Sequence, residues 1–461
     1  MNNKPEIIWN INLWGWSDSE LQWVANSVSE TECLDIHSEP WLIKVNQALK
    51  KVGNTDALVV SFVPCSDGNT YAFSSNGKVY KKTPTELELM TTIWYSILDA
   101  LEFNGFIYFT GTSNLWQVAV PAAWSVDWSS KNETFWSYIN ADTIYHPLHH
   151  QNLILYIGDW NLVAQVDSTT GTHVYTADAL DLQKQYRITT LGKYDNDLVI
   201  GATVKWDRSL SEIFRWNTWS VSYTTSDPVP ESSINAIFSI DNMTVVQAGE
   251  KGNIYSYDGY QLNKIKRIPW DWSANNGAIV HRNANINFNG LPLFWLSNIT
   301  GDPVKQGIYS FWSWSSTYPT VLNHEYTISE NKKNWVTIWA MVALRHTFLV
   351  SWSVDGIHWI DEIDWNSKAS TAFFKTRKIQ LPRLSISNLS AKVAYRKAPN
   401  DISILSIEND TQMRSLDLVR DMKRKIFSSN KSAIEASSLQ IKVELHGEWN
   451  SAPEIEYLII E

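Results

Sequence analysis

Two segments, Asn104-Gly-Phe-Ile-Tyr108 and Asn152-Leu-Ile-Leu-Tyr156, carry the pattern that decides the fold of this chain. Each joins a polar turn residue to a short β-branched or aromatic run, as is typical of a strand entered through a hairpin turn. The pattern recurs at Asp56-Ala-Leu-Val-Val60, Asn196-Asp-Leu-Val-Ile200, Asn242-Met-Thr-Val-Val246, Asn289-Gly-Leu-Pro-Leu293 and Arg345-His-Thr-Phe-Leu349. Successive starts lie 48, 48, 44, 46, 47 and 56 residues apart, which matches the length of a four-stranded propeller blade. We therefore predict an all-β fold built on a β-propeller of about seven blades, with six or eight blades as the alternatives.

The same spacing divides the chain of 461 residues into three parts. Residues 1–50 are expected to form an N-terminal arm that helps to close the propeller, residues 51–365 the propeller, and residues 366–461 a C-terminal β-sandwich-like module. The segment around Trp41-Leu-Ile-Lys-Val45 is a candidate for a strand added to the last blade. Five segments with alternating polarity, but without the blade spacing, predict the strands of the C-terminal module: Phe373–Leu384, Ala391–Arg396, Ile402–Ile407, Leu439–Leu445 and Ile455–Ile460.

A few segments depart from the strand pattern. The polar stretch between Pro319 and Trp335 is interpreted as a loop, and helical turns are possible over Ala25–Leu34, Val45–Val52 and Arg414–Phe427. The most hydrophobic stretch, Trp335–Trp352, carries a charged arginine near its centre, so we expect strands there and no membrane span.

Charge and cysteine content narrow the classes of partner. The formal net charge of −10 argues against non-specific binding of nucleic acid or anionic lipid, since both require basic patches. The two cysteines, Cys33 and Cys65, are too few for a disulfide framework, and we expect both to be free thiols.

The tryptophan content is anomalous, because the chain has 25 Trp and only 19 Gly. Several of these tryptophans stand where a tight turn favours glycine, as in Gly158-Asp-Trp-Asn161 and Pro269-Trp-Asp-Trp-Ser273. One hypothesis is that the gene comes from a lineage that decodes UGA as glycine and is translated here with UGA as tryptophan. The alternative is a protein that is naturally rich in tryptophan. Under the first hypothesis, clusters of tryptophan are poor evidence for a sugar-binding site.

Three groups of residues have side chains that could take part in chemistry. His146, His149 and His150 form a histidine cluster, but no carboxylate lies at ligand spacing, which favours a structural or surface role over a metal site. The acids Asp178 and Asp181, or Asp361, Glu362 and Asp364, could serve as paired carboxylates only if the fold placed them across a cleft, and a solvated face is the simpler interpretation. We therefore predict a protein that is not an enzyme, with no catalytic, cofactor-binding or metal-binding residues and no cofactor.

One further motif has a family likeness. Ser353-Val-Asp-Gly-Ile-His-Trp359 resembles the Asp-box turn of sialidase-like propellers, with one residue missing between the aspartate and the glycine. In those proteins the motif is a structural turn, so it predicts a β-hairpin in a propeller rather than a sialidase.

Over most of its length the chain resembles the β-propeller tail hub or nozzle proteins of short-tailed bacteriophages. The likeness rests on Asn12-Leu-Trp-Gly-Trp-Ser-Asp-Ser-Glu20, on Cys33-Leu-Asp-Ile-His-Ser-Glu-Pro-Trp41, and on the closing segments Lys378–Pro382, Leu439–Leu445 and Ser451–Leu458. It implies a virion structural protein that assembles as a homo-oligomeric ring at the DNA exit channel, beside other tail or portal proteins. Viral DNA would pass without specific binding, and no membrane would be involved. The alternative function is a carbohydrate-binding or glycosidase-like propeller, marked by an acidic, aromatic-lined pocket on one propeller face.

Overall fold

The structure is a computed structural model, and every regular element among its described residues is a β-strand. It describes residues 6–8, 28–39, 42–112, 114–120, 145–171, 173–204, 210–240, 243–249, 253–266, 281–296, 306–312, 321–330, 336–376, 379–380, 390–397, 402–406, 411–416, 424–428, 438–447 and 452–460. None of these residues belongs to a helix long and apolar enough to cross a membrane. The chain divides into two compact units, unit 1 (residues 1–50, 307–331 and 363–461) and unit 2 (residues 51–306 and 332–362).

Unit 2 is built from antiparallel sheets in which consecutive strands are neighbours. The first sheet consists of β6 (Val59–Pro64), β7 (Thr70–Ser74), β8 (Lys78–Lys82) and β9 (Leu87–Thr92), and the second of β10 (Ile97–Phe103), β11 (Phe106–Gly111) and β12 (Leu115–Ala119). The third sheet consists of β13 (Leu148–Gln151), β14 (Ile154–Asp159), β15 (Leu162–Asp167) and β16 (Val174–Asp181). The fourth consists of β17 (Tyr186–Tyr194), β18 (Asp197–Val204), β19 (Ser211–Trp216) and β20 (Thr225–Val229). They are followed by β21 (Ile234–Ile240), β22 (Met243–Ala248), β23 (Asn253–Tyr257) and β24 (Leu262–Lys266); by the hairpin β25 (Asn285–Phe288) and β26 (Leu291–Leu296); and by β29 (Thr337–Ala343), β30 (Phe348–Val354), β31 (Ile357–Lys368) and β5 (Gln47–Thr55).

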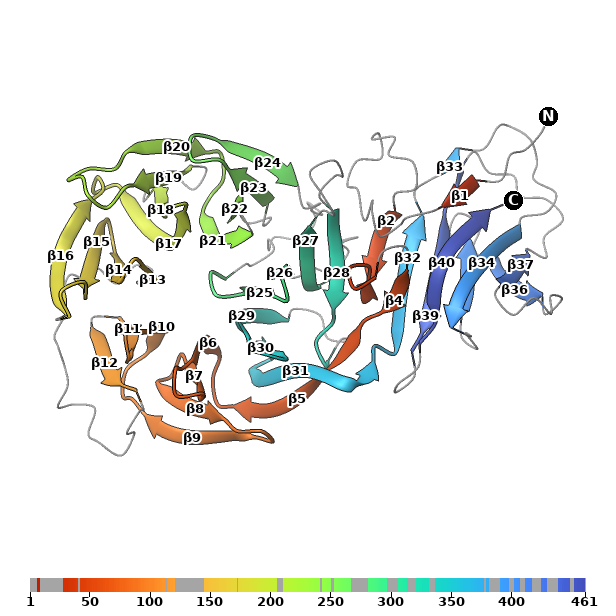
Figure 1. Ribbon diagram of the computed structural model, residues 1–461, viewed down its shortest axis with the longest axis horizontal. Coiled ribbons are helices and arrows are strands. Elements are labelled where there is room, and N and C mark those ends of the chain that lie inside the picture. Colours follow the sequence, from red (N-terminus) through yellow and green to blue (C-terminus); the bar gives the residue numbers. More distant parts are fainter. Residues whose placement is uncertain are drawn as a thin grey trace. The chain divides into compact units, whose positions relative to one another are not determined.

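The sheets of unit 2 form a closed ring. The first strand of each sheet contacts the first strand of the next, in the order β6, β10, β13, β17, β21, β25 and β29, and β29 contacts β6 again (Figure 1). Sheets arranged around an axis in this way define a β-propeller, so the predictions of an all-β fold and of a propeller are confirmed.

The hydrophobic core of the propeller lies between the faces of adjacent sheets. One cluster joins Phe103 and Tyr108 of the β10–β12 sheet to Leu155 and Val166 of the next sheet, and equivalent clusters fill the following interfaces. A single sheet would leave both of its apolar faces in water, so each sheet is stabilised by its two neighbours.

Hairpin turns explain why an asparagine begins the repeated pattern. Asn104 and Gly105 connect β10 to β11 with φ values of 49° and 78°, and Asn289 and Gly290 connect β25 to β26 with 54° and 78°. A two-residue turn of this type needs positive φ at both central positions, which asparagine and glycine tolerate best. The other repeats precede the second strand of their sheets, whereas the repeat beginning at Asp56 precedes β6, the first strand of its sheet. The position predicted for this repeat is therefore one strand too early. The matching hairpin contains Gly68, with φ 83°.

Unit 1 contains one extended strand ladder with the order β2-β32-β39-β35-β36-β37-β34-β40-β4-β3 among the described residues, and β1 also pairs with β40. Its strands are β1 (Glu6–Ile8), β2 (Val28–Glu32), β3 (Leu34–Asp35), β4 (Ile43–Val45), β32 (Thr371–Thr376), β34 (Ser390–Lys397), β35 (Ile402–Ser406), β36 (Thr411–Leu416), β37 (Arg424–Ser428), β39 (Ile441–His446) and β40 (Glu454–Ile460). The unit also holds the pairs β27 (Gly307–Trp312) with β28 (Val321–Tyr326) and β33 (Ile379–Gln380) with β38 (Ser438–Leu439).

Several local predictions are wrong. The strand added to the β29–β31 sheet is β5, whereas Ile43–Val45 pairs with β40 and β3. The helical turn expected over Val45–Val52 falls on the end of β4 and the first part of β5, because the open edge of β31 supplies backbone hydrogen bonds that outweigh a weak helical propensity. The segment Ala25–Leu34 contains β2, and the segment Arg414–Phe427 overlaps the end of β36 and most of β37. The loop expected between Pro319 and Trp335 contains β28, whose polar side chains are buried among partners described below.

Candidate axial pocket

The innermost strands of the propeller carry β-bulges at matching positions. The register shifts once in each of five strands, and the residue passed over is Val60, Leu98, Thr189, Asn235 or Trp339. A bulge changes the direction of the side chain it displaces. All five of these residues line one cavity. The repeated bulge therefore brings one side chain from each of these five strands to the same site.

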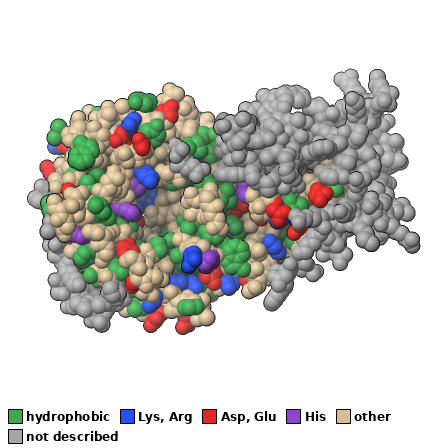
Figure 2. All heavy atoms as spheres, viewed as in Figure 1, with side chains coloured by type: hydrophobic (Ala, Val, Ile, Leu, Met, Phe, Trp, Pro, Cys, Tyr) green, Lys and Arg blue, Asp and Glu red, His purple; other side chains and the backbone are tan. Residues whose placement is uncertain are grey.

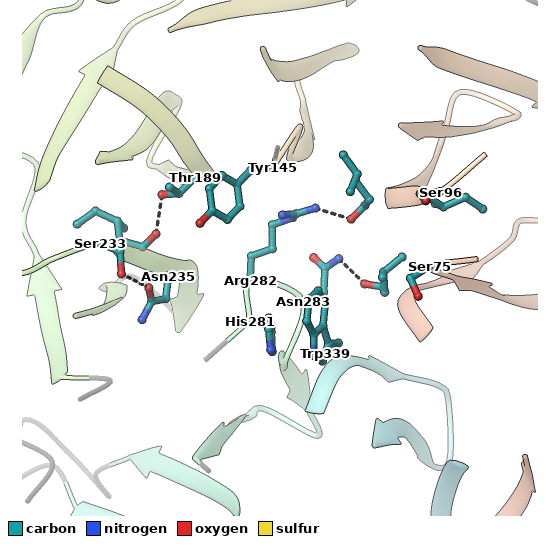
Figure 3. A pocket seen from close by; sticks show the side chains of 14 residues that line it. Ser75, Ser96, Tyr145, Thr189, Ser233, Asn235, His281, Arg282, Asn283 and Trp339 are labelled. Carbon is teal, nitrogen blue, oxygen red and sulfur yellow. Dashed lines mark hydrogen bonds between the residues drawn. The ribbon is translucent and has the colours of Figure 1, made fainter. Parts of the chain in front are cut away.

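The cavity, called here the axial pocket, has a volume of about 640 Å³. Its other lining residues come from the turn after β7, from strand starts and from segments that precede the innermost strands: Ser75, Ser96, Ile97, Tyr145, Ser233, Ile234, His281, Arg282 and Asn283. The propeller face is hollowed near the centre of the ring (Figure 2), and the close-up shows polar side chains converging there from several sheets (Figure 3).

One side of the pocket is fixed by three consecutive residues, His281, Arg282 and Asn283, which we call the axial strap. Arg282 Nε lies 3.2 Å from Asp99 Oδ2, and its Nη2 donates to the Leu98 carbonyl at 2.5 Å. Asn283 Nδ2 donates to Asp99 Oδ1 at 2.8 Å and to the Val60 carbonyl at 2.9 Å. The strap therefore ties the β25 side of the ring to β6 and β10.

Asp99 is the anchor of the strap. Its side chain is almost completely buried and also accepts backbone hydrogen bonds from Leu148 at 2.9 Å and from Ala100 at 2.9 Å. A buried carboxylate is tolerated when it is paired and fully hydrogen-bonded, which is the case here. The carboxylate of Asp99 thereby neutralises the charge of the Arg282 guanidinium, which lines the pocket.

An aromatic pair completes the lining. The rings of His281 and Trp339 stack with centroids 3.7 Å apart and an interplanar angle of 23°. Burial, reinforced by the nearby Arg282 charge, lowers the pKa of His281 to about 3. The imidazole is therefore neutral at physiological pH, and it contributes an aromatic surface rather than a charge.

Hydroxyl and amide groups supply most of the polar lining. Thr189 Oγ1 donates to the Ile234 carbonyl at 2.6 Å, and Ser233 Oγ donates to Asn235 Oδ1 at 2.5 Å. The first bond joins β17 to β21, and the second fixes two side chains of one segment against each other (Figure 3). The arrangement can hydrogen-bond a polar ligand, and none of its described lining residues is one of the carboxylates that glycoside hydrolysis uses.

The histidine cluster does not converge on a common point. His146 Nδ1 bonds the Gly158 carbonyl at 3.0 Å and lies 3.5 Å from Asp159, whereas His149 and His150 are adjacent residues of β13 and so face opposite sides of the sheet. Burial lowers the pKa of His149 to about 4. Among the residues that the structure describes, no group of three or more His, Cys, Asp or Glu could hold a metal ion.

The candidate acids are also dispersed. Asp181 accepts from Asn161 Nδ2 at 2.6 Å, Glu362 pairs with Lys82 at 3.3 Å, and the Asp361 side chain is fully buried. None of them lines the axial pocket. The Asp-box-like segment is a hairpin between β30 and β31, with Asp355 and Gly356 at positive φ, as predicted.

A second polar cluster lies within unit 1, around Glu325 of β28. Oε1 of this buried residue accepts from Ser310 Oγ at 2.5 Å and from Asn323 Nδ2 at 2.7 Å, and it lies 2.8 Å from His37 Nε2. Oε2 accepts from Asn46 Nδ2 at 2.8 Å. A catalytic triad would place the histidine between serine and acid, using both ring nitrogens. Here Ser310 Oγ and Glu325 Oε1 both contact the same ring nitrogen, His37 Nε2, at 3.1 and 2.8 Å, and the serine also donates to the carboxylate directly, so the three groups do not have the geometry of a triad.

Both cysteines are buried and free, which confirms the expected thiols. Burial, with smaller contributions from Glu102 and Asp67, raises the pKa of Cys65 to about 12. This thiol is therefore poorly nucleophilic in the folded protein.

Sequence reasoning did not find the axial pocket. Its residues belong to no motif, and Asp99 and Arg282 are separated by 183 positions. The available signal was the repeat itself, since equivalent positions of the innermost strands of a propeller lie at the same height around the axis. The Asn12–Glu20 segment and the Pro269–Ser273 tryptophans lie outside the described residues.

No protein-family model and no curated protein matches the chain. Among solved structures it is similar to the Pan2 WD40 domain of Neurospora crassa, with 10% identity and a TM-score of 0.44 over 69% of this chain and 96% of that one. It is also similar to BamB from Moraxella catarrhalis, with 10% identity and a TM-score of 0.39 over 72% and 94% of the two chains. A third similar structure is the extracellular domain of a putative hybrid two component system from B. thetaiotaomicron, with 12% identity and a TM-score of 0.48 over 83% of this chain and 47% of that one. Likeness at this level concerns the fold and transfers no function.

Proposed function

We propose that the chain is a virion structural protein that assembles as a ring at the DNA exit channel of a short-tailed phage particle. In this proposal the propeller has seven blades and is closed by β5, and residues 366–461 form a β-sandwich-like module that incorporates strands from the N-terminal arm. The protein has no enzymatic role, and its partners are further copies of itself and neighbouring tail or portal proteins.

The observation that carries the proposal is the way in which the N-terminal residues are built into distant sheets. β5 is the outermost strand of the β29–β31 sheet, and β1 and β4 pair with β40, more than 400 residues later in the chain. Release of these N-terminal strands requires the rupture of the β5–β31 pair in one sheet and of the β1–β40 and β4–β40 pairs in the other. Contacts of this kind form late in folding and slow unfolding, which suits a particle component that must persist without repair.

The charge of the chain supports the same role. A net charge of −10 disfavours adhesion to duplex DNA, whose phosphates are bound mainly by Lys and Arg. A conduit through which DNA slides requires weak attachment to its wall.

The test is assembly of the full-length protein, followed by light scattering after size exclusion and by negative-stain electron microscopy. We expect closed rings of one copy number, and no retention of a duplex oligonucleotide at about 150 mM salt. A protein that remains monomeric at micromolar concentrations, or that is missing from peptides of purified particles, would contradict the proposal.

A further inference from the structure

We infer that the axial pocket binds a small, neutral, polyhydroxylated ligand of the monosaccharide class. The site lies within the propeller of a single chain and does not depend on assembly of several copies. The inference can therefore fail while the proposed function holds, and the proposed function can fail while the inference holds.

The dimensions of the pocket suit such a ligand. A cavity of about 640 Å³ lies inside the range of roughly 300–1,000 Å³ that is usual for small-molecule sites. Seven of its fourteen lining residues lie on the innermost strands, and the others lie in the connecting segments next to them. The strand positions are held by the ladders of the ring, and preorganised positions lower the ordering cost of binding.

The charge of the pocket favours a neutral ligand. Among the lining residues that the structure describes, the charged side chain is that of Arg282, and it is paired with Asp99 and with the Leu98 carbonyl. The neighbouring His281 is neutral at physiological pH because burial lowers its pKa to about 3. An anionic ligand would have to compete with Asp99 for the guanidinium, whereas a neutral ligand leaves this pair intact.

The hydrogen-bonding groups of the pocket match hydroxyls. The side chains of Ser75, Ser96 and Tyr145 line it and make no hydrogen bond with another described residue. Each carries a hydroxyl that both donates and accepts, as sugar hydroxyls do. The stacked rings of His281 and Trp339 add an aromatic surface to the lining. The combination of unengaged hydroxyls, an aromatic wall and a neutralised arginine is the basis of the inference.

The experiment measures saturation-transfer NMR, followed by calorimetry, with the folded protein and a defined set of probes: glucose, galactose, mannose, N-acetylglucosamine and N-acetylgalactosamine. Two anions, inorganic phosphate and N-acetylneuraminic acid, form the comparison arm. We expect saturable binding of at least one neutral sugar and weaker or no binding of the anions.

Two variants place the ligand. Ser96→Trp puts a large side chain at the exposed edge of the pocket and should weaken binding at least about tenfold, whereas Thr92→Trp adds the same side chain to exposed β9, outside the lining, and should leave binding unchanged. The double variant Ser75→Ala with Ser96→Ala should weaken binding about three- to tenfold through lost hydrogen bonds. Absence of saturable binding by all five sugars, preference for the anions, or equal binding by both Trp variants would overturn the inference.

Discussion

Replacing Asp99 with alanine should destabilise the propeller more than any exposed substitution, because it removes the anchor of the axial strap. The Asp99 side chain is 5% exposed and accepts from the side chains of Arg282 and Asn283 and from the backbone N–H groups of Leu148 and Ala100. The change leaves a guanidinium that is 16% exposed without its counter-charge. Breaking a buried pair in this way costs about 3–5 kcal/mol. That is a large fraction of a domain stability of about 5–15 kcal/mol.

The assay is urea-induced unfolding at pH 7, followed by tryptophan fluorescence, with Asp67→Ala as the matched control. Asp67 is an exposed aspartate in the β6–β7 turn, where it bonds Asn69, and its removal should cost at most about 1 kcal/mol. Asp99→Asn keeps the shape and one acceptor oxygen but loses the charge, so its midpoint should fall between the other two. If Asp99→Ala unfolds within about 0.5 kcal/mol of Asp67→Ala, the strap does not stabilise the ring.

Three other substitutions or measurements test local features. Trp160 has φ 59°, so Trp160→Gly should be neutral or should stabilise the protein by up to about 1 kcal/mol in thermal unfolding. Trp219 is exposed and has no positive φ, so Trp219→Gly should be neutral or destabilising. A change of stability with the same sign at both sites would refute the explanation from backbone strain. Because the pKa of Cys65 is raised to about 12, iodoacetamide at pH 8 should label this thiol far more slowly in the native protein than in urea, and equal rates would show that it is accessible. His149 has a pKa lowered to about 4 in the folded state against 6.5 in the unfolded chain, so the unfolded state binds the extra proton between these values. Stability should therefore fall by about 1.4 kcal/mol per pH unit as pH drops from 6.5 to 4, and His149→Gln should flatten this slope in urea titrations; an unchanged slope would exclude His149 as its source.

The fold was predictable where local chemistry and global topology agree. Asn104 and Asn289 begin the repeated pattern because each stands at a hairpin position with positive φ, and the strands that follow are buried on both faces. The turn residue and the apolar run that follows it therefore both indicate the same structural unit, a hairpin that leads into a buried strand. The constant spacing then follows from the number of strands per sheet.

The parts that could not be predicted depend on contacts that are distant in sequence. β28 is polar because Asn323 and Glu325 bond Leu34, His37 and Asn46, and a window around residues 319–335 contains none of these partners. The pocket has the same property, since its lining is selected by bulges in five different sheets. A bulge is a mismatch between two paired strands, so it becomes visible only when their register is known.

The register also separates two kinds of tryptophan, which composition alone could not do. Trp216 is buried in the core, and its Nε1 donates to the Ser220 carbonyl at 2.8 Å, so a tryptophan fits there. Trp352 pairs with Ile338, just before the bulge of its sheet. At the same register position the other bulged sheets have small residues, namely Ser74, Gly111, Ala202 and Ala248.

A side chain at this position is disfavoured by two observations, one at Gly111 and one at Trp352. A Cβ added at Gly111 would lie 2.5 Å from the Trp116 ring, and the buried Nε1 of Trp352 has no hydrogen-bond partner among the described residues, at a cost of about 1–3 kcal/mol. Together with the positive φ of Trp160, this favours the hypothesis that some of the tryptophans stand for glycine. Peptides of the protein purified from its natural source should then have masses that fit glycine at positions 160 and 352 and tryptophan at position 216. Tryptophan at all three positions would refute recoding, and the mismatch at Trp352 would then have to be relieved by repacking of its sheet.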